Sequence, residues 1–311
     1  MSESDQVYIL GAGAIGFSLA VHLKNHGRRV TAVRTSMDEQ PLTEIQITLQ
    51  EGEGQLIQAP IEVVSLSKMN QMNGVVVITA KSYANRKIAA KLESIQKSSP
   101  IVILQNGIGV EKPFIDHGFS QIFRCIIYAT SQKRRAYHYS YRPISKSPIG
   151  IISGDKDTLE YIINILHTDG FPFCKEMEIQ KEIWKKAIIN SVFNSICPLL
   201  EVDNGVFHRD NEHAQLAEQI VDECIQVTDR LRLGLDKDSI MEQIHAISRG
   251  SDGQLISTLQ DIMNGRKTEI ESLNLEISRI AENLTPPIFL NNTKLLGKMV
   301  LLKSTAHLKS C

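Results

Sequence analysis

The stretch VYILGAGAIG, residues 7–16, runs from a short apolar strand into a glycine-rich turn, and a helical pattern follows as far as Gly27. The order strand, Gly-x-Gly-x-x-Gly, helix is typical of a dinucleotide-binding unit. In such a unit Gly11 permits the tight turn, Gly13 lets backbone amides approach a diphosphate, and Gly16 lets the helix pack on the strand. We therefore expect the diphosphate to bind at the helix N-terminus. The expected binding residues are Gly11, Ala12, Gly13, Ala14, Ile15 and Gly16.

The residue after the second expected strand indicates which dinucleotide binds. The strand at 30–33 is followed by Arg34, and the next acidic residue is Asp38. Enzymes that use NAD usually carry Asp or Glu here to bind the ribose hydroxyls, whereas a guanidinium can bind a 2′-phosphate through two parallel hydrogen bonds. Arg34 therefore favours NADPH over NADH, with an ordinary solvated arginine as the alternative interpretation.

Length and composition limit the class of protein. The 311 residues are enough for two domains with separate cores. Hydrophobic residues make up 42% and charged residues 22%, the usual balance of a soluble globular protein. The net charge of −1 gives no reason to expect nucleic acid or an anionic membrane as a partner. No apolar run approaches the roughly 20 residues that cross a bilayer.

The cysteines and the N-terminus bear on compartment and metal binding. Five cysteines are scattered along the chain without a C-x-x-C pair, which indicates reduced thiols and no zinc site. The first six residues are polar and acidic, unlike a signal peptide. We expect a cytoplasmic protein without a bound metal. The sequence leaves the oligomeric state open, a homodimer included.

Alternating strands and helices in the first half predict a parallel sheet with helices on both faces. Strands are expected at 45–49, 75–80, 101–104, 122–129, 137–141, 149–153 and 171–174, and helices at 84–96 and 158–167. From residue 178 onward the pattern is helical. We therefore predict an α/β fold, with an N-terminal Rossmann-like doubly wound sheet over residues 1–177. An all-helical C-terminal domain should follow over residues 178–311.

Two further polar motifs follow expected strands. Lys81 follows the strand at 75–80, and Asn106 follows the strand at 101–104. Ligands of open parallel sheets bind beyond the carboxyl ends of the strands, at the point where the strand order reverses. We expect Lys81 to meet cofactor phosphate or substrate carboxylate. Asn106 should form hydrogen bonds near the nicotinamide ribose or the substrate.

The helix expected at 178–200 carries an unusual row of polar side chains. Lys186, Asn190 and Asn194 are spaced four apart and share one face, while most of the circumference is apolar. Buried amides and a buried ammonium are costly unless each has a partner. We therefore expect this row to face a polar pocket.

Farther on, the pair Thr268 and Glu271 resembles a capping box, which would place Glu269 in the first turn of a helix.

Together these motifs resemble those of ketopantoate reductase, the NADPH-dependent family that makes pantoate for coenzyme A synthesis. The resemblance spans nearly the whole chain and keeps the order and spacing of the motifs. Its parts are GAGAIG at 11–16, VVVITAKSY around Lys81, QNGIG at 105–109, W-x-K-x-x-x-N-x-x-x-N at 184–194, NG at 204–205, S-x-x-QD at 257–261 and R-x-TE at 266–269.

The resemblance implies roles for individual residues. Lys186 is similar to the family's catalytic lysine, and Glu269 to its partner near the cofactor. Lys81 and Asn106 match positions that line the cofactor cleft, and Arg34 matches the position that meets the 2′-phosphate. The residues that align with substrate-binding positions are Asn106, Lys186, Asn190, Asn194, Asn204 and Ser257. The segment at 124–131 departs from the family, because Cys125 and Thr130 stand where glycine is common.

The expected reaction is hydride transfer from NADPH to the ketone carbon of a small 2-keto acid, with Lys186 stabilising and protonating the ketone oxygen. The Asn and Ser side chains both donate and accept hydrogen bonds, which suits the hydroxyl of ketopantoate. One alternative is a related reductase that converts another 2-keto acid to a D-2-hydroxy acid. A second alternative is a non-catalytic NADPH sensor.

Overall fold

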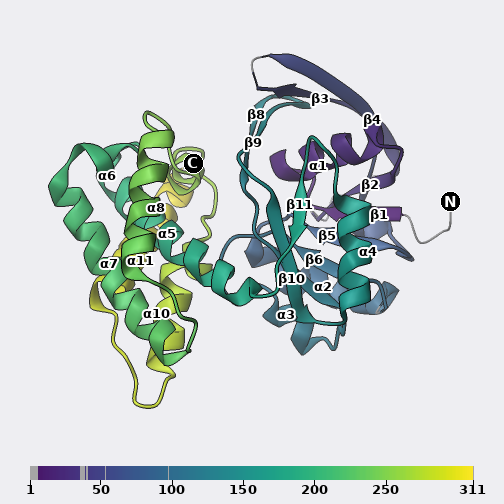
Figure 1. The fold of residues 1–311 in the computed structure, drawn as a ribbon. Coiled ribbons are helices and arrows are strands. Elements are labelled where there is room, and N and C mark those ends of the chain that lie inside the picture. Colours follow the sequence, from purple (N-terminus) through teal and green to yellow (C-terminus); the bar gives the residue numbers. More distant parts are fainter. Residues whose placement is uncertain (1–5, 36–38, 40, 53, 97, 311) are drawn as a thin grey trace. The chain divides into compact units, whose positions relative to one another are not determined.

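The computed structural model describes residues 6–35, 39, 41–52, 54–96 and 98–310, with side chains described as far as residue 306. Asp38 lies outside the described residues. The chain forms two compact units: Met1–Gln105 with Val110–Ile179, and Asn106–Gly109 with Gln180–Cys311 (Figure 1). Among the described helices, none combines the length and apolar character that crossing a membrane requires.

The first unit is built on a single sheet with the order β11-β10-β7-β6-β5-β1-β2-β4-β3-β9-β8. Its strands are β1 (Gln6–Leu10), β2 (Arg29–Arg34), β3 (Thr43–Glu51), β4 (Gln55–Ser65), β5 (Val75–Ile78), β6 (Ile101–Ile103), β7 (Ile122–Cys125), β8 (Ala129–Arg135), β9 (His138–Pro143), β10 (Ser147–Ser153) and β11 (Phe173–Lys175). Its α-helices are α1 (Ala14–Asn25), α2 (Asn85–Ile95), α3 (Lys112–Asp116) and α4 (Lys156–Leu166).

The apolar central strands explain why helices cover both faces of the sheet. Val75 and Val77 of β5 pack into one core with α1 and α4. Val76 and Ile78 of the same strand pack into a second core with α2 and α3. Successive residues of a strand point to opposite faces, so a strand buried on both sides must be apolar throughout. The predicted doubly wound α/β fold is confirmed.

The strand order reverses at β1, which pairs in parallel with β2 on one side and β5 on the other. The glycine-rich turn follows β1, and Lys81 follows β5, so both predicted motifs lie at this switch point. Crevices of this kind are the usual ligand sites of doubly wound sheets.

The single strand expected at 122–129 is wrong. β7 ends at Cys125 and pairs with β6 and β10. β8 begins at Ala129, and among the described strands its single partner is β9. The β8–β9 hairpin joins the far edge of the sheet, where His138 of β9 pairs with Thr48 of β3. Between these strands the chain crosses from β7, the third strand from one edge, to the opposite edge of the sheet, and the apolar pattern does not reveal that break.

The second unit is helical, as predicted. It contains α5 (Ile179–Leu200, of which Ile179 belongs to the first unit), α6 (Val206–Arg209), α7 (Asn211–Arg230), α8 (Lys237–Gly250), α9 (Ser257–Met263), the 3₁₀ helix η4 (Ile270–Ser272), α10 (Asn274–Glu282) and α11 (Asn291–Ser310). Asp210 and Asp236 start α7 and α8, because their carboxylates accept hydrogen bonds from first-turn amides at 2.8 and 2.7 Å. α11 packs against α7, α9 and α10.

Candidate active site

The turn after β1 has two positions that admit only glycine. Gly11 has φ +124°, and a Cβ there would lie 2.3 Å from the backbone nitrogen of Ala80. A Cβ on Gly16 would lie 2.1 Å from the carbonyl oxygen of Gly11. A Cβ on Gly13 would instead meet no described atom within 4 Å beyond its chain neighbours. The backbone at Gly13 is therefore open to the close approach of a ligand.

The N-terminus of α1 suits an anion. Its N-cap is Gly13, which makes no side-chain capping hydrogen bond, and the first turn holds no acidic residue. In α4, by contrast, Asp155 accepts a hydrogen bond from the Thr158 amide at 2.8 Å. The first turn of α1 therefore presents backbone donors and the positive end of the helix dipole, which fit a diphosphate.

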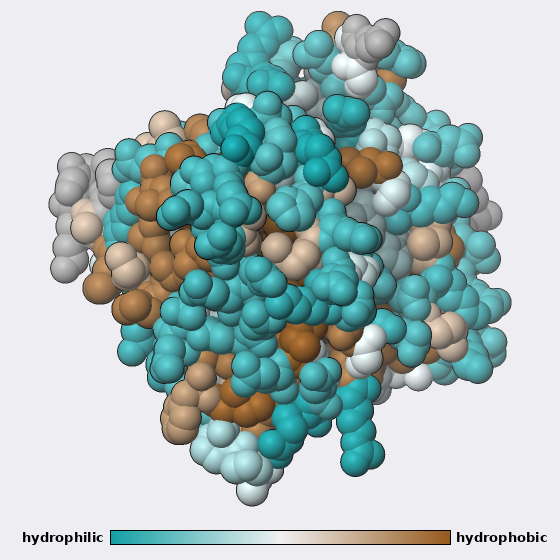
Figure 2. Space-filling view, turned by 60° about the vertical axis from the view of Figure 1, so that its left-hand side comes forward, coloured by the Kyte–Doolittle hydropathy of each residue, from teal (hydrophilic) through white to brown (hydrophobic). Residues whose placement is uncertain are grey.

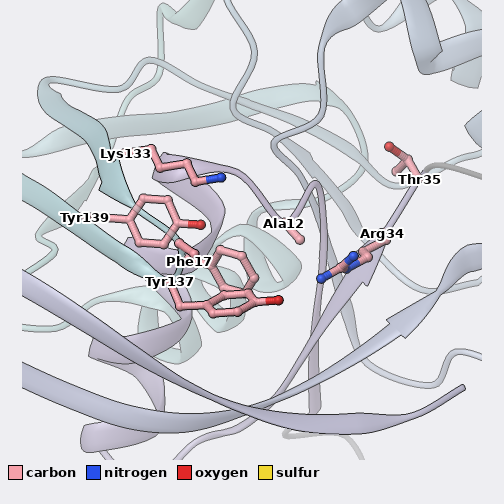
Figure 3. Close-up of a pocket in the computed structure, with 8 residues that line it drawn as sticks. Ala12, Phe17, Arg34, Thr35, Lys133, Tyr137 and Tyr139 are labelled. Atoms are coloured by element: carbon pink, nitrogen blue, oxygen red, sulfur yellow. The ribbon is translucent and has the colours of Figure 1, made fainter. Parts of the chain in front are cut away.

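A hollow of about 460 Å³ lies beside this turn within the first unit. Figure 3 shows side chains converging on it from three parts of the chain. The lining residues are Ala12 and Phe17, then Arg34 and Thr35, then Lys133, Ala136, Tyr137 and Tyr139. Two residues predicted to bind the cofactor, Ala12 and Arg34, are thus brought to one hollow.

Burial and the neighbouring Tyr137 raise the pKa of Tyr139, and the positive charge of Arg34 opposes this shift. The Tyr139 phenol is therefore neutral at pH 7.

A buried polar network fixes the chain directly before Asn106. Asn85 donates to Oε1 of Gln105 at 2.7 Å, and Gln105 donates back to Oδ1 of Asn85 at 2.8 Å. Arg124 donates to the carbonyl oxygen of Gln105 at 3.2 Å and to the carboxylate of Glu111 at 2.5 Å. Arg124 is fully buried, so its charge needs this carboxylate. The network therefore fixes both the side chain of Gln105, through Asn85, and its backbone carbonyl, through Arg124.

In the second unit, α5 places Lys186, Asn190 and Asn194 along one face of a largely apolar helix. Lys186 and Asn190 are half-buried, and Asn194 is 4% exposed. Thr258 of α9 donates to Oδ1 of Asn194 at 2.6 Å. This bond fixes the Asn194 amide and leaves its NH₂ group oriented as a donor.

Asn204 and Ser257 lie near the ends of neighbouring helices. Asn204, between α5 and α6, donates its amide hydrogen to the carbonyl of Gln254 at 2.9 Å and accepts at its own carbonyl from Ser248 at 2.8 Å. Its side-chain Oδ1 is buried and has no hydrogen-bond partner in the described part of the chain. A buried acceptor of this kind fits a ligand that donates, such as a hydroxyl. Ser257 is the first residue of α9 and is exposed.

The tetrapeptide Asn106–Gly109 belongs to the second unit, where it lies against η4. The Ile108 amide donates to the carbonyl of Ser272 at 2.8 Å, and a Cβ on Gly107 would lie 2.5 Å from Oγ of Ser272. Ser272 in turn donates to the carbonyl of Glu269 at 2.9 Å. The structure thus brings together the segments of Asn106 and Glu269, which are both half-buried.

The capping box expected from Thr268 and Glu271 is wrong. Oγ1 of Thr268 is buried and has no hydrogen-bond partner among the described residues. Glu271 forms an ion pair with Lys267 at 2.7 Å instead of reaching back to the helix start. The short helix η4 begins after Glu269, which is its N-cap and makes no side-chain capping bond.

Several residues around these sites escaped sequence reasoning. Lys133 and Tyr137 line the hollow, Thr258 binds Asn194, and Arg124 anchors Gln105. The sequence offered one signal for this wall of the hollow. The alternating tyrosines at 137, 139 and 141 would lie on one face of a strand, and such an aromatic face is expected to pack against another element. Across the described residues, no cluster of three or more His, Cys, Asp or Glu side chains could hold a metal.

Comparison with known proteins gives matches along most of the chain. The family model described as ketopantoate reductase PanE/ApbA matches residues 7–153, and the model of its C-terminal region matches residues 178–294. A 2-dehydropantoate 2-reductase from Pyrococcus abyssi is 26% identical over 298 residues, covering 91% of this chain and 94% of that protein. A 2-dehydropantoate 2-reductase from Aquifex aeolicus is 26% identical over 319 residues, covering 97% of each.

Solved structures share the fold over nearly the full length. A dimeric ketopantoate reductase from Staphylococcus aureus superposes with a TM-score of 0.81 at 19% identity, covering 97% of this chain and 99% of the other. A D-mandelate dehydrogenase in complex with NADH and anilino(oxo)acetate gives a TM-score of 0.83, also at 19% identity and with the same coverage. At this identity the likeness shows the fold alone.

Proposed function

The chain belongs to the ketopantoate reductase family of oxidoreductases that act on CH–OH groups, and from that premise we propose that it reduces 2-dehydropantoate (ketopantoate) to pantoate with NADPH. The reaction serves pantothenate and coenzyme A biosynthesis. The observation that carries the proposal is the row of Lys186, Asn190 and Asn194 on a buried, largely apolar helix. Asn194 is buried and Lys186 and Asn190 are half-buried, and removing such polar groups from water is costly unless partners offset their desolvation.

Residues 1–177, which contain nearly all of the first unit, are proposed as the NADP-binding domain. Its support is the open backbone at Gly13, the uncapped first turn of α1 and the guanidinium of Arg34 beside that turn. Lys81, directly beyond β5, is proposed to meet cofactor phosphate or substrate carboxylate, and Asn106 and Glu269 to contact the nicotinamide end.

The helical region, residues 178–311, is proposed to bind the substrate and donate the proton. Bound NADPH supplies the hydride. Negative charge grows on the ketone oxygen as the carbonyl is reduced, and the proposed role of the Lys186 ammonium is to neutralise that charge and donate a proton to this oxygen. Glu269 holds the ammonium. Hydrogen bonds to the carboxylate and hydroxyl of the keto acid come from Asn106, Asn190, Asn194, Asn204 and Ser257.

The test measures the decrease in NADPH absorbance when ketopantoate is added and then determines the configuration of the product. Lys186→Ala should lower kcat at least about 100-fold, the usual contribution of a general acid, while NADPH still binds. Lys185→Ala removes the neighbouring lysine of the same helix and should leave kcat near wild type. Near-normal turnover by Lys186→Ala would remove Lys186 from the role of acid.

A second candidate substrate class is favoured by the likeness to D-mandelate dehydrogenase, which is as close in fold as the ketopantoate reductase. The two candidate substrates differ in the side chain of the keto acid. Ketopantoate carries a hydroxyl that suits the unpartnered Oδ1 of Asn204, whereas an aromatic keto acid does not. Values of kcat/KM for ketopantoate, pyruvate and phenylpyruvate decide between them. A protein that binds NADPH but oxidises it with no 2-keto acid would support the alternative of a non-catalytic sensor.

We extend the proposal to a homodimer in the cytoplasm. The similar reductase from Staphylococcus aureus is described as dimeric. On α11, Leu295, Met299 and Leu302 are 58%, 45% and 69% exposed at spacings that place them on one face. Figure 2 shows apolar side chains gathered in patches on the surface turned to the viewer. Light scattering on the wild type and on Leu295→Glu tests whether this face joins two copies, since a dimer that persists in the variant excludes it.

A further inference from the structure

We propose that the β8–β9 hairpin forms the second wall of the site for the 2′-phosphate of NADPH, with Lys133 as its cation opposite Arg34. The inference rests on the proposed use of NADPH. It assigns a specificity-determining role to a residue outside the glycine-rich turn and outside the strand end that normally selects the dinucleotide.

The charges of the hollow support an anionic ligand. Lys133 and Arg34 line it from different chain segments, and in Figure 3 their charged ends extend towards the same space. Thr35 adds a hydroxyl, and none of the described lining residues is acidic. A phosphate monoester carries nearly two negative charges at pH 7 and accepts several hydrogen bonds, so a guanidinium and an ammonium together suit it.

No side-chain contact within the described part of the protein explains the position of Lys133. Its ammonium makes no hydrogen bond or ion pair with the described residues. The next residue, Arg134, does not line the hollow and donates to Oγ of Ser140 at 3.1 Å. Of these two adjacent cations, only Lys133 is directed at the hollow.

The hairpin is held against the cofactor-binding helix, so Lys133 does not depend on a loose loop. Ser131 of β8 and Ser18 of α1 share a hydrogen bond of 3.0 Å. The ring centroids of Tyr139 and Phe17 lie 5.6 Å apart. Lys133 follows Ser131 by two residues and therefore lies on the same side of β8.

The turn of the hairpin adds a second sign of constraint. Tyr137 has φ +60°, a left-handed conformation that costs a non-glycine residue roughly 1 kcal/mol. Its side chain lines the hollow from this strained position. An aromatic side chain held at such a turn gives the hollow a flat apolar wall beside its two cations.

The test measures binding by isothermal titration calorimetry, independently of turnover. NADPH, NADH and adenosine 2′,5′-bisphosphate are titrated into the wild type, Lys133→Gln and Arg134→Gln. Lys133→Gln should weaken NADPH and the bisphosphate about fivefold, or about 1 kcal/mol, the upper range for an exposed ion pair. It should leave NADH unchanged. Arg134→Gln removes the same charge from the same hairpin and should leave all three affinities unchanged.

The outcomes separate the inference from the proposed function. If the wild type reduces ketopantoate with NADPH and Lys133→Gln binds NADPH as tightly as the wild type, the inference alone is overturned. Equal weakening of NADPH and NADH also overturns it, because the lysine then does not read the 2′-phosphate. A wild type that does not bind NADPH overturns the cofactor proposal and the inference together. Selective loss of NADPH and bisphosphate binding confirms the inference even if ketopantoate is not the substrate.

Discussion

Replacing His22 by glutamine should make the folded protein less sensitive to acid. His22 lies on α1, is 4% exposed, and packs with ring-centroid distances of 5.0 Å to Tyr141 and 6.0 Å to Phe171. Burial lowers the pKa of His22 from 6.5 to about 4, with a smaller contribution from His26. The imidazole is therefore neutral in the folded protein at pH 5, where it is charged in the unfolded chain.

The sign of the pH dependence follows from this difference. Between pH 6.5 and pH 4 the unfolded chain binds a proton at His22 that the folded chain does not bind. The stability that neutral His22 provides is complete above pH 6.5 and is lost as the pH falls towards 4. The full shift corresponds to about 3 kcal/mol, of which about 2 kcal/mol is lost by pH 5.

Urea unfolding followed by far-UV circular dichroism at pH 8 and pH 5 measures this loss. The wild type should lose about 2 kcal/mol more between the two pH values than His22→Gln does. His138→Gln, which removes a histidine from the β8–β9 hairpin, should retain the wild-type loss. Equal losses in the wild type and His22→Gln would refute the reasoning.

Glu51 acts in the opposite direction and needs its own control. Its Oε1 lies 3.0 Å from Nε2 of His22, and burial raises the pKa of the Glu51 carboxyl. A raised carboxyl pKa gives stability that is present at low pH and is lost as the pH rises. The same comparison in a Glu51→Gln background therefore isolates the histidine.

Three substitutions test the sites directly. Arg124→Met leaves the Glu111 carboxylate without its partner and should lower the free energy of unfolding by about 3–5 kcal/mol in urea titrations, whereas a loss below about 1 kcal/mol would contradict the buried pair. Gly16→Ala should weaken NADPH binding and lower Tm, because the new methyl group meets a carbonyl oxygen 2.1 Å away; wild-type values of both would count against the tight turn. Thr258→Val removes the 2.6 Å hydrogen bond to Asn194 and should raise KM for ketopantoate about fivefold, or about 1 kcal/mol, and an unchanged KM would separate Asn194 from the substrate.

Much of the fold could be predicted because its signals are local. Strand β1, the glycine-rich turn and α1 follow one another between Gln6 and Asn25, and each conformation is favoured by its own residues. The pairing of β9 with β3 could not be predicted in this way. Thr48 and His138 are far apart in the sequence, and the alternation of apolar residues fixes the face of a strand but not its neighbour.

The candidate site residues likewise fall into those set by local sequence and those set by long-range contacts. The row at Lys186, Asn190 and Asn194 is set by the helical period alone, so four-residue spacing was enough to place the three on one face. Lys133 was missed because its position depends on where the hairpin joins the sheet. The capping box failed because Glu271 has a competing partner in Lys267, which a motif of four residues does not include.

The excursion of Asn106–Gly109 into the second unit has a consequence for how the protein is made. A ribosome synthesises this tetrapeptide together with the sheet, long before it synthesises Ser272, to which Ile108 donates. N-terminal regions generally fold first as the chain emerges. The sheet can therefore form before Ser272, the hydrogen-bond acceptor of its loop at Ile108, has been synthesised. A fragment that starts at Gln180 would lack the four residues that pack against η4.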